Sequence, residues 1–288
     1  MTFLWLLFFW FFNSTENSKQ IPVLQRETDL PTVVSESSGL VFTDGQLWTH
    51  NDHGGYPEIY RLDSISGKIL QTVVIDNYPN TDWEEISADA DNFFIGDFGN
   101  NSGMRKDLKI LIVRKSQITN KKVVHVKAEA INFRYSDQVD YTKNNRNNFD
   151  CEAMLTMSDS IYLFTKDRGD DLTHVYAVSK TSGTYLAHCS QSFVTEGRIC
   201  GASFNSEDRS IALIGYLPGT THSFIFLLND YKDNQFFSGR HSRIELTSSI
   251  RHWKTEGIAW ESGSRFFVSC ERTYSQHAGL FLYSWIVI

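Results

Sequence analysis

The chain has 288 residues, of which 41% are hydrophobic, and its formal net charge is −7. This length can hold one domain or two. The acidic balance argues against nucleic acid as a partner, because binding to a phosphate backbone requires clustered lysine and arginine.

Residues 1–19 begin with the apolar block MTFLWLLFFWFF, which is followed by polar residues. The block is shorter than the ~20 apolar residues that span a bilayer, so we expect no stable membrane span. We interpret residues 1–19 as a signal peptide or apolar N-terminal segment, although no Lys or Arg precedes the apolar run and no clear cleavage site follows it. The protein is therefore expected to be secreted or periplasmic; a misplaced start codon and a peripheral membrane anchor are the alternatives.

A short pattern recurs five times in residues 20–288, which we treat as a single domain. In each copy a polar residue precedes a short strand of small and apolar residues, a tight turn and a second apolar strand. The five polar residues are Ser38, Glu85, Glu152, Cys200 and Glu256. A third and a fourth strand-like run follow, as in EIYRLD and KILQTVVI after the first copy. Repeats of this length with four strands each are typical of β-propeller blades.

The last copy contains only three strand-like runs, and the run IPVLQRET at residues 21–28 belongs to no hairpin of its own. We expect this N-terminal strand to pair with the C-terminal blade, which would close the ring and remove exposed strand edges. The 21 Phe, 12 Tyr and 7 Trp residues favour pleated, half-buried surfaces. The predicted fold class is therefore all-β, as a five-bladed β-propeller closed by the N-terminal strand.

The four cysteines contain no C-x-x-C pair, which argues against a structural zinc site. Cys151, Cys200 and Cys270 fall on the predicted inner strands, where a free cysteine behaves as a small buried apolar residue. Disulfides are the alternative in an exported protein.

The first strand of each propeller blade lines the central channel, so the five polar residues should converge there. Three of them are glutamates, which would repel one another unless a cation lay among them. Calcium is the expected ion because it accepts oxygen ligands in flexible numbers, and transition metals would prefer histidine or cysteine. The alternatives are that the glutamates pair with arginines or are protonated.

The stretches SSGLVFTDGQLW and TEGIAW, together with a glutamate in the second, third and fifth blades, resemble the calcium-activated nucleotidase (apyrase) family. The resemblance implies a five-bladed propeller with one calcium ion in the channel, held at Ser38, Glu85, Glu152, the Cys200 region and Glu256. The family has serine in place of Cys200, and an acidic pair with a basic residue in place of NDHGG. The DWE and GDFGNN motifs also resemble exported bacterial propellers of uncharacterised function.

The second strand of each blade should deliver its last residues to one rim of the channel. Asp52 and Asp97 are candidate general bases there. The candidates for holding a substrate are Asn51, His53, Asn100, Lys166, Arg168, Glu271 and Arg272. Turn formation and local hydrogen bonding are the alternative explanation for such rim residues.

Two function classes follow. The first is a calcium-dependent hydrolase of phosphate esters, phosphoanhydrides or lactones, in which the ion polarises an oxygen or activates water. The second is a non-catalytic binding module in which calcium is structural, and the fold alone does not decide between them. The expected partner is a small anionic molecule, a sugar or a peptide at the rim, bound by a monomer.

Overall fold

The computed structural model describes residues 20–166, 168–220, 222–246 and 254–287. In these ranges the protein is built from β-strands with three 3-10 turns, η1 (Thr32–Val34), η2 (Lys115–Gln117) and η3 (Phe236–Ser238). The all-β prediction is confirmed. None of the helices in the described ranges is long or apolar enough to cross a membrane. The predicted signal peptide, residues 1–19, lies outside the described residues.

Twenty-one strands follow one another along the described part of the chain. They are β1 (Gln20–Asp29), β2 (Ser37–Thr43), β3 (Gln46–Asn51), β4 (Glu58–Leu62), β5 (Ile69–Ile75), β6 (Trp83–Ala88), β7 (Asn92–Asp97), β8 (Lys109–Arg114), β9 (Val123–Val126), β10 (Glu129–Tyr135), β11 (Cys151–Met157), β12 (Ser160–Thr165), β13 (Thr173–Ser179), β14 (Gly183–Phe193), β15 (Arg198–Phe204), β16 (Ile211–Tyr216), β17 (Ser223–Asn229), β18 (Arg240–Glu245), β19 (Thr255–Ser262), β20 (Arg265–Cys270) and β21 (Gly279–Val287).

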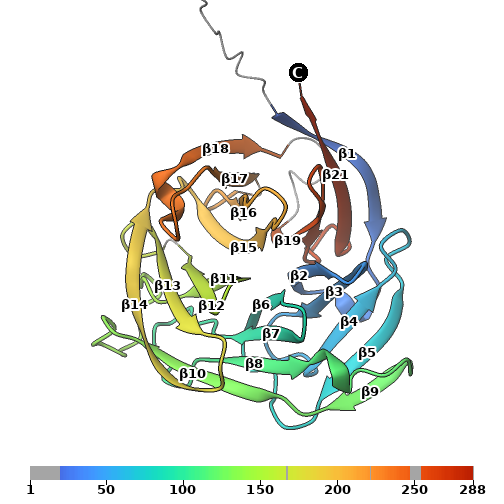
Figure 1. Ribbon diagram of the computed structural model, residues 1–288, viewed down its shortest axis with the longest axis horizontal. Coiled ribbons are helices and arrows are strands. Elements are labelled where there is room, and N and C mark those ends of the chain that lie inside the picture. The colour runs from blue at the N-terminus through green and yellow to red at the C-terminus, as the bar shows by residue number, and fades with distance from the viewer. Residues whose placement is uncertain (1–19, 167, 221, 247–253, 288) are drawn as a thin grey trace, which may run out of the picture.

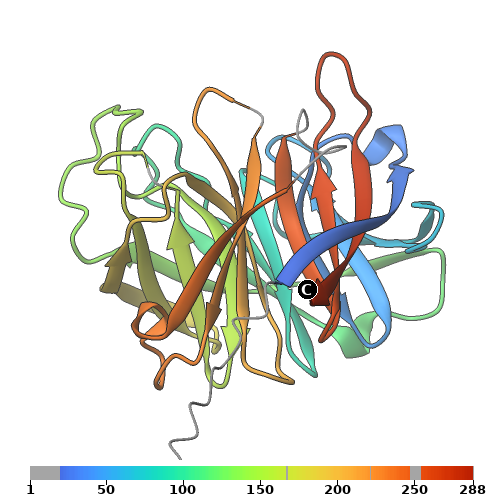
Figure 2. The same ribbon diagram turned by 90° about the horizontal axis from the view of Figure 1, so that it is seen from above.

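The strands form four sheets that stand around a common centre (Figures 1 and 2). Their orders are β2-β3-β4-β5-β9, β11-β12-β13-β14-β10-β8-β7-β6, β15-β16-β17-β18 and β1-β21-β20-β19. Most neighbours are antiparallel hairpin partners, whereas β5 pairs with β9 and β10 pairs with β14 in parallel. The β10–β14 pairing joins two four-stranded units, β6-β7-β8-β10 and β11-β12-β13-β14, at their outer edges, whereas β9 adds a fifth strand to the unit β2-β3-β4-β5.

The innermost strands are β2, β6, β11, β15 and β19 (Figure 1). They contact one another in that cyclic order, and β19 contacts β2. Each of them contains one copy of the recurring sequence pattern and is followed by its hairpin partner, as the sequence predicted. The five copies therefore meet in the middle of the molecule.

Strand β1 pairs antiparallel with β21, from Gln20 opposite Val287 to Asp29 opposite Gly279. The predicted pairing of the N-terminal strand with the C-terminal strands is confirmed. It completes a four-stranded sheet from the two ends of the described chain.

Apolar side chains fill the spaces between neighbouring sheets. Leu155 and Phe164, for example, share a buried cluster with Leu213 and Phe226 of the neighbouring sheet. All four cysteines are free, and Cys151, Cys200 and Cys270 are buried while Cys189 is exposed. Free buried thiols are what the sequence predicted for these three positions.

Candidate functional site

Each inner strand has a β-bulge near its start, where one residue or two lack a partner on the neighbouring strand. The unpaired residues are Ser38 with Gly39, Glu84, Glu152, Cys200 and Glu256. A bulge redirects a side chain, so Ser38, Glu84, Glu152, Cys200 and Glu256 hold equivalent positions, which we call the inner ring. The sequence analysis gave this position in the second copy to Glu85, but the register gives it to Glu84.

Glu85 has a different role in the structure. Its side chain is fully buried, with Oε1 accepting the backbone N–H of Ile86 at 3.0 Å and Oε2 accepting that of Ala202 at 2.9 Å. Burial raises the pKa of Glu85 well above its ordinary value, and the backbone N–H groups of Ala202, Ile86, Leu40 and Met154 oppose this shift. Both carboxyl oxygens face backbone donors from the inner strands, an arrangement that suits a structural anchor better than a metal ligand.

Small residues stand at the position of Glu85 in the other four inner strands, namely Gly39, Ala153, Gly201 and Gly257. A Cβ on Gly201 would lie 2.3 Å from the backbone oxygen of Glu256, closer than any real contact. These strands therefore approach one another closely, and the Glu85 side chain is the one that enters the space between them.

Glu152 is held by basic side chains. Its Oε2 lies 2.5 Å from Nζ of Lys166, and its Oε1 lies 3.8 Å from Nη2 of Arg168. Arg168 also pairs with Asp150, at 2.5 Å from its Nε. Burial alone would raise the pKa of Glu152, but Lys166 and Arg168 bring it below its ordinary value. Pairing with basic side chains, one of the alternatives to metal binding, is thus present here.

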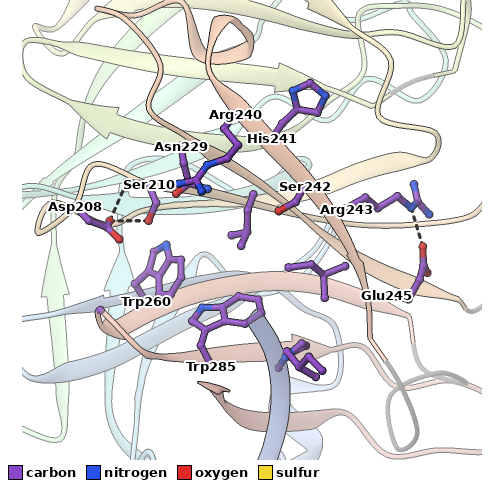
Figure 3. Close-up of a pocket in the computed structure, with 15 residues that line it drawn as sticks. Asp208, Ser210, Asn229, Arg240, His241, Ser242, Arg243, Glu245, Trp260 and Trp285 are labelled. Atoms are coloured by element: carbon purple, nitrogen blue, oxygen red, sulfur yellow. Dashed lines mark hydrogen bonds and ion pairs between the residues drawn. The ribbon is translucent and has the colours of Figure 1, made fainter. Parts of the chain in front are cut away.

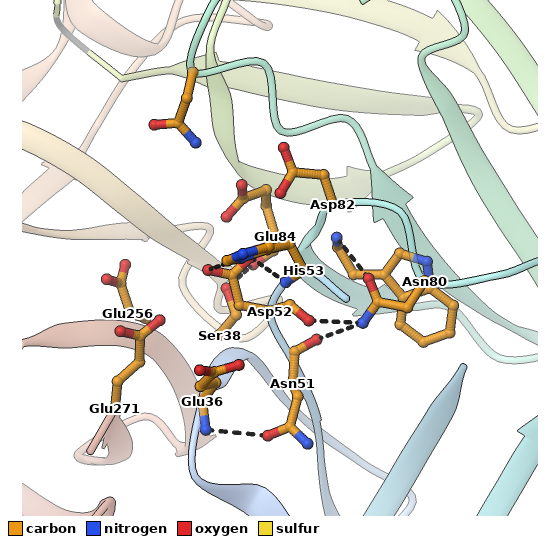
Figure 4. Close-up of polar contacts among 12 residues, drawn as sticks. Glu36, Ser38, Asn51, Asp52, His53, Asn80, Asp82, Glu84, Glu256 and Glu271 are labelled. Atoms are coloured by element: carbon orange, nitrogen blue, oxygen red, sulfur yellow. Dashed lines mark hydrogen bonds and ion pairs between the residues drawn. The ribbon is translucent and has the colours of Figure 1, made fainter. Parts of the chain in front are cut away.

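Glu256 is paired in the same way. Its Oε1 lies 2.7 Å from Nζ of Lys254, and the same ammonium lies 2.8 Å from Oε2 of Glu271. Burial raises the pKa of Glu256 to about 7, although Lys254 opposes this. The carboxyl groups of Glu256 and Glu271 lie side by side, away from Asp82 (Figure 4).

The other two ring residues donate to backbone oxygens. Ser38 Oγ donates to the oxygen of Glu84 at 2.8 Å, and Cys200 Sγ donates to the oxygen of Thr255 at 3.0 Å. A thiol is also a poor ligand for calcium, which prefers oxygen. The shell implied by the apyrase resemblance therefore does not fit a central calcium ion, because each of its side chains is bonded within the protein.

A second group of side chains shares Glu84 with the inner ring. It consists of three acids and a histidine, namely Asp52, Asp82, Glu84 and His53, and we call it the acidic cluster (Figure 4). One ligand atom from each of Asp52, His53 and Asp82 lies within 4.8 Å of the others. Asn80 fixes this arrangement. Its amide donates to the backbone oxygen of Asp52 at 2.8 Å, and its Oδ1 accepts the N–H of Trp83, the first residue of β6, at 3.1 Å.

Glu84 is 4% exposed, and its carboxyl group has no hydrogen bond or ion pair with any residue that the structure describes. A Cβ added to Gly99 would lie 2.1 Å from Oε1 of Glu84 and 2.5 Å from Oδ2 of Asp82, so both carboxyl groups pack against this glycine. Burial raises the pKa of Glu84 well above its ordinary value, and Glu152, Asp52 and Asp82 raise it further. Several carboxyl groups thus converge at Glu84.

The pKa values of the other two carboxyl groups in the cluster are raised as well. Burial and the charge of Asp52 raise the pKa of Asp82 to about 6. Burial also raises the pKa of Asp52, against a hydrogen bond from the backbone N–H of His53. His53 is largely exposed, and Asp52 raises its pKa. A cation at this cluster would stabilise the ionised carboxylates.

Several predicted rim residues have structural partners. Asp97 is buried and pairs with Arg105 at 2.8 Å and Lys109 at 3.4 Å. Asn51 Oδ1 accepts a backbone N–H at 3.1 Å, and Asn100 Oδ1 accepts another at 2.9 Å. Hydrogen bonding to backbone N–H groups therefore accounts for the two asparagines.

Asp52 and His53, neighbours in the sequence, lie in the acidic cluster, and Lys166, Arg168 and Glu271 lie near the glutamates of the inner ring. Arg272 is exposed, and its backbone N–H donates to the oxygen of Ser35 at 2.7 Å. The sequence analysis missed Asp82, Glu84 and Lys254. Asp82 and Glu84 belong to the DWE motif, where two acids flank a tryptophan that becomes fully buried.

A cavity of about 840 Å³ lies elsewhere, between β18 and the pair β1 and β21 (Figure 3). Trp260 and Trp285 line it, and none of the predicted site residues does. Arg243 on its wall is already paired with Glu245 at 2.7 Å. This cavity is separate from the acidic cluster.

No protein-family model and no curated protein matches the chain. Among solved structures, it is similar to a chain of Kuenenia stuttgartiensis hydrazine synthase, with a TM-score of 0.41 and 10% sequence identity. The similarity covers 84% of this chain and 57% of that chain, so the protein spans little more than half of the structure it matches. A similarity this distant assigns no function.

The surroundings of Glu85 predict the effect of replacing it with glutamine. In Glu85→Gln one of two oxygens that accept backbone N–H groups becomes an NH₂ group, which leaves a buried donor facing another donor. We expect a loss of about 1–3 kcal/mol of unfolding free energy, measured by urea denaturation. Glu36→Gln is the control, because Glu36 is exposed. If the Glu85→Gln protein is as stable as the control, the anchoring role of Glu85 is contradicted.

Proposed function

We propose that the protein is an exported five-bladed β-propeller, closed by β1, that binds a divalent cation at the acidic cluster and recognises a small anionic molecule through that ion. The cyclic order of the inner strands and the four strands of each unit support the propeller. The apolar start of the sequence supports export. Calcium is the expected ion.

The observation that carries the proposal is the carboxyl group of Glu84. It is buried beside Asp82 and Asp52 and has no hydrogen-bonding partner among the described residues. An unpaired buried carboxylate is costly, so such a group must be protonated or meet a cation. Carboxylate oxygens from Asp52, Asp82 and Glu84 are hard ligands, which calcium prefers. The partly exposed side of the cluster at Asp52 leaves room for water or an anionic ligand on the ion.

Metal-dependent hydrolysis is the second candidate function, and His53 favours it. Its side chain is 70% exposed and lies 3.6 Å from Asp52, and the pKa of His53 is raised by that carboxylate. A histidine in this position can donate a proton to a leaving group of an ester, a phosphoanhydride or a lactone. The ion would polarise the carbonyl or phosphoryl oxygen, which makes the carbon or phosphorus bonded to it easier to attack.

Calcium should stabilise the protein through the acidic cluster. At about 100 times its dissociation constant an ion adds ~2.7 kcal/mol, which corresponds to a rise of roughly 5–10 °C in the unfolding midpoint of a domain of this size. We expect the rise for the protein from residue 20 onward, measured by calorimetry with calcium and with EGTA. Glu84→Gln and Asp82→Asn should lose most of it, and Glu36→Gln should keep it. An equal rise in Glu84→Gln would exclude Glu84 as a ligand.

The raised pKa of Asp82 predicts a pH dependence. Because this pKa is about 6 in the folded state and ~3.9 in an unfolded chain, the folded state binds more protons between these values. Without metal, this group therefore lowers the unfolding free energy as pH rises from about 4 to about 6. Calcium displaces the protons, so the calcium-induced rise in midpoint should be larger at pH 7 than at pH 5 in metal-free buffers. The same rise at both values would contradict the assignment.

The two candidate functions predict different results in an assay for substrate cleavage. Under the hydrolase hypothesis, calcium-dependent cleavage of nucleoside diphosphates, p-nitrophenyl phosphate or a simple lactone should be detected, and His53→Ala should lower kcat by about 10²–10⁴-fold. The calcium-induced rise in midpoint should persist in His53→Ala, since three carboxylates remain. Calcium binding without turnover of any of these substrates would leave recognition without catalysis as the function.

A further inference from the structure

Lys166 is a buried cation at the inner ring. It follows Thr165, the last residue of β12, which pairs with Cys151 at the start of β11. The register therefore delivers Lys166 beside Glu152, and its backbone N–H donates to the oxygen of Asp150 at 2.7 Å. The lysine is thus positioned by the same hairpin that carries a ring glutamate.

The ammonium group faces the ring. Its Nζ lies 2.5 Å from Oε2 of Glu152, and the Lys166 side chain is 4% exposed. On another side the ammonium lies 5.5 Å from the centre of the Tyr216 ring, which comes from the end of β16. A buried ammonium needs such partners, because desolvation of an unpaired charge is costly.

The charge of Lys166 reaches beyond Glu152. Burial alone would lower the pKa of Lys166, but Glu152 and Glu256 raise it well above its ordinary value. The ammonium in turn opposes the upward shift of the pKa of Glu84 and of Glu256. The ammonium of Lys166 is therefore paired with Glu152 and acts on the charges of the other two ring glutamates only at longer range.

We propose that the Lys166 ammonium takes the place of a metal ion at the inner ring, as a cation built into the chain. The two ring residues without charge fit this role, since the Ser38 hydroxyl and the Cys200 thiol donate to backbone oxygens. An ammonium carries three donors and no acceptor, so it complements carboxylates from several strands. The proposal does not depend on an ion at the acidic cluster.

Removal of the ammonium should uncover a calcium site at the ring. Lys166→Met keeps the apolar stem and leaves Glu152 without its closest cation. The test uses an Asp82→Asn background, which disables the acidic cluster, and compares Asp82→Asn alone with Asp82→Asn/Lys166→Met. Lys115→Met in the same background is the matched control, because Lys115 forms a 2.7 Å ion pair with Asp44, which follows the end of β2 opposite to the ring residue Ser38.

In EGTA, Asp82→Asn/Lys166→Met should unfold at a lower temperature than Asp82→Asn. Saturating calcium should then raise its midpoint by at least about 5 °C, with no such rise in the background or the Lys115→Met control. Terbium luminescence, excited through aromatic residues such as Tyr216, is a second readout and should appear only when Lys166 is removed.

A calcium-induced rise of about 5 °C or more in Asp82→Asn itself would overturn the proposal, because an ion would then enter with the ammonium in place. A folded Asp82→Asn/Lys166→Met protein that ignores calcium and terbium would also overturn it. If that variant does not fold, addition of Glu152→Gln removes the unpaired partner as well. This triple variant should fold and show no calcium response, and its failure to fold would contradict the proposal.

Discussion

The buried carboxylate of Glu85 joins inner strands that are far apart in the sequence. Its oxygens accept N–H groups from Ile86 in β6 and Ala202 in β15. The other inner strands have glycine or alanine at this level, which allows their backbones to come close enough to surround one side chain. The position of the inner ring depends on this contact, because the bulge residues stand one position before it in each strand. The acidic cluster depends on it in turn through Glu84, the immediate neighbour of Glu85.

Charge is distributed unevenly around this centre. Glu152 and Glu256 have ammonium partners at 2.5 Å and 2.7 Å, whereas Lys166 acts on Glu84, and Arg105 on Asp82, only through longer-range charge interactions. The protein neutralises its ring with lysines and leaves its negative potential at the acidic cluster. Low local dielectric strengthens both effects, since buried charges are poorly screened. A cation from solution is therefore attracted to one side of the centre.

The sequence predicted the strand pairs, the N-terminal strand beside the C-terminal one and the meeting of five polar residues, because alternating apolar strands and turns are local signals. It placed Glu85 instead of Glu84 in the ring, since a bulge adds one residue without any mark in the sequence. It missed Lys254 because the lysine lies just before its strand, where most lysines are solvated. Asp97 ends a strand, as expected from the sequence, and only the fold shows that Arg105 and Lys109 pair with it.

The pairing of β1 with β21 has a consequence for how the chain reaches this fold. Synthesis makes β1 before the other described strands and β21 after them, so β1 has no hydrogen-bonding partner in its sheet until β21 has left the ribosome. The contact also joins residues at maximal separation in the described chain, and such contacts form slowly because of the loop that must be closed. A chain cut short before β21 therefore has an open strand edge at β1 and another at β20, which marks it for aggregation or for recognition by chaperones.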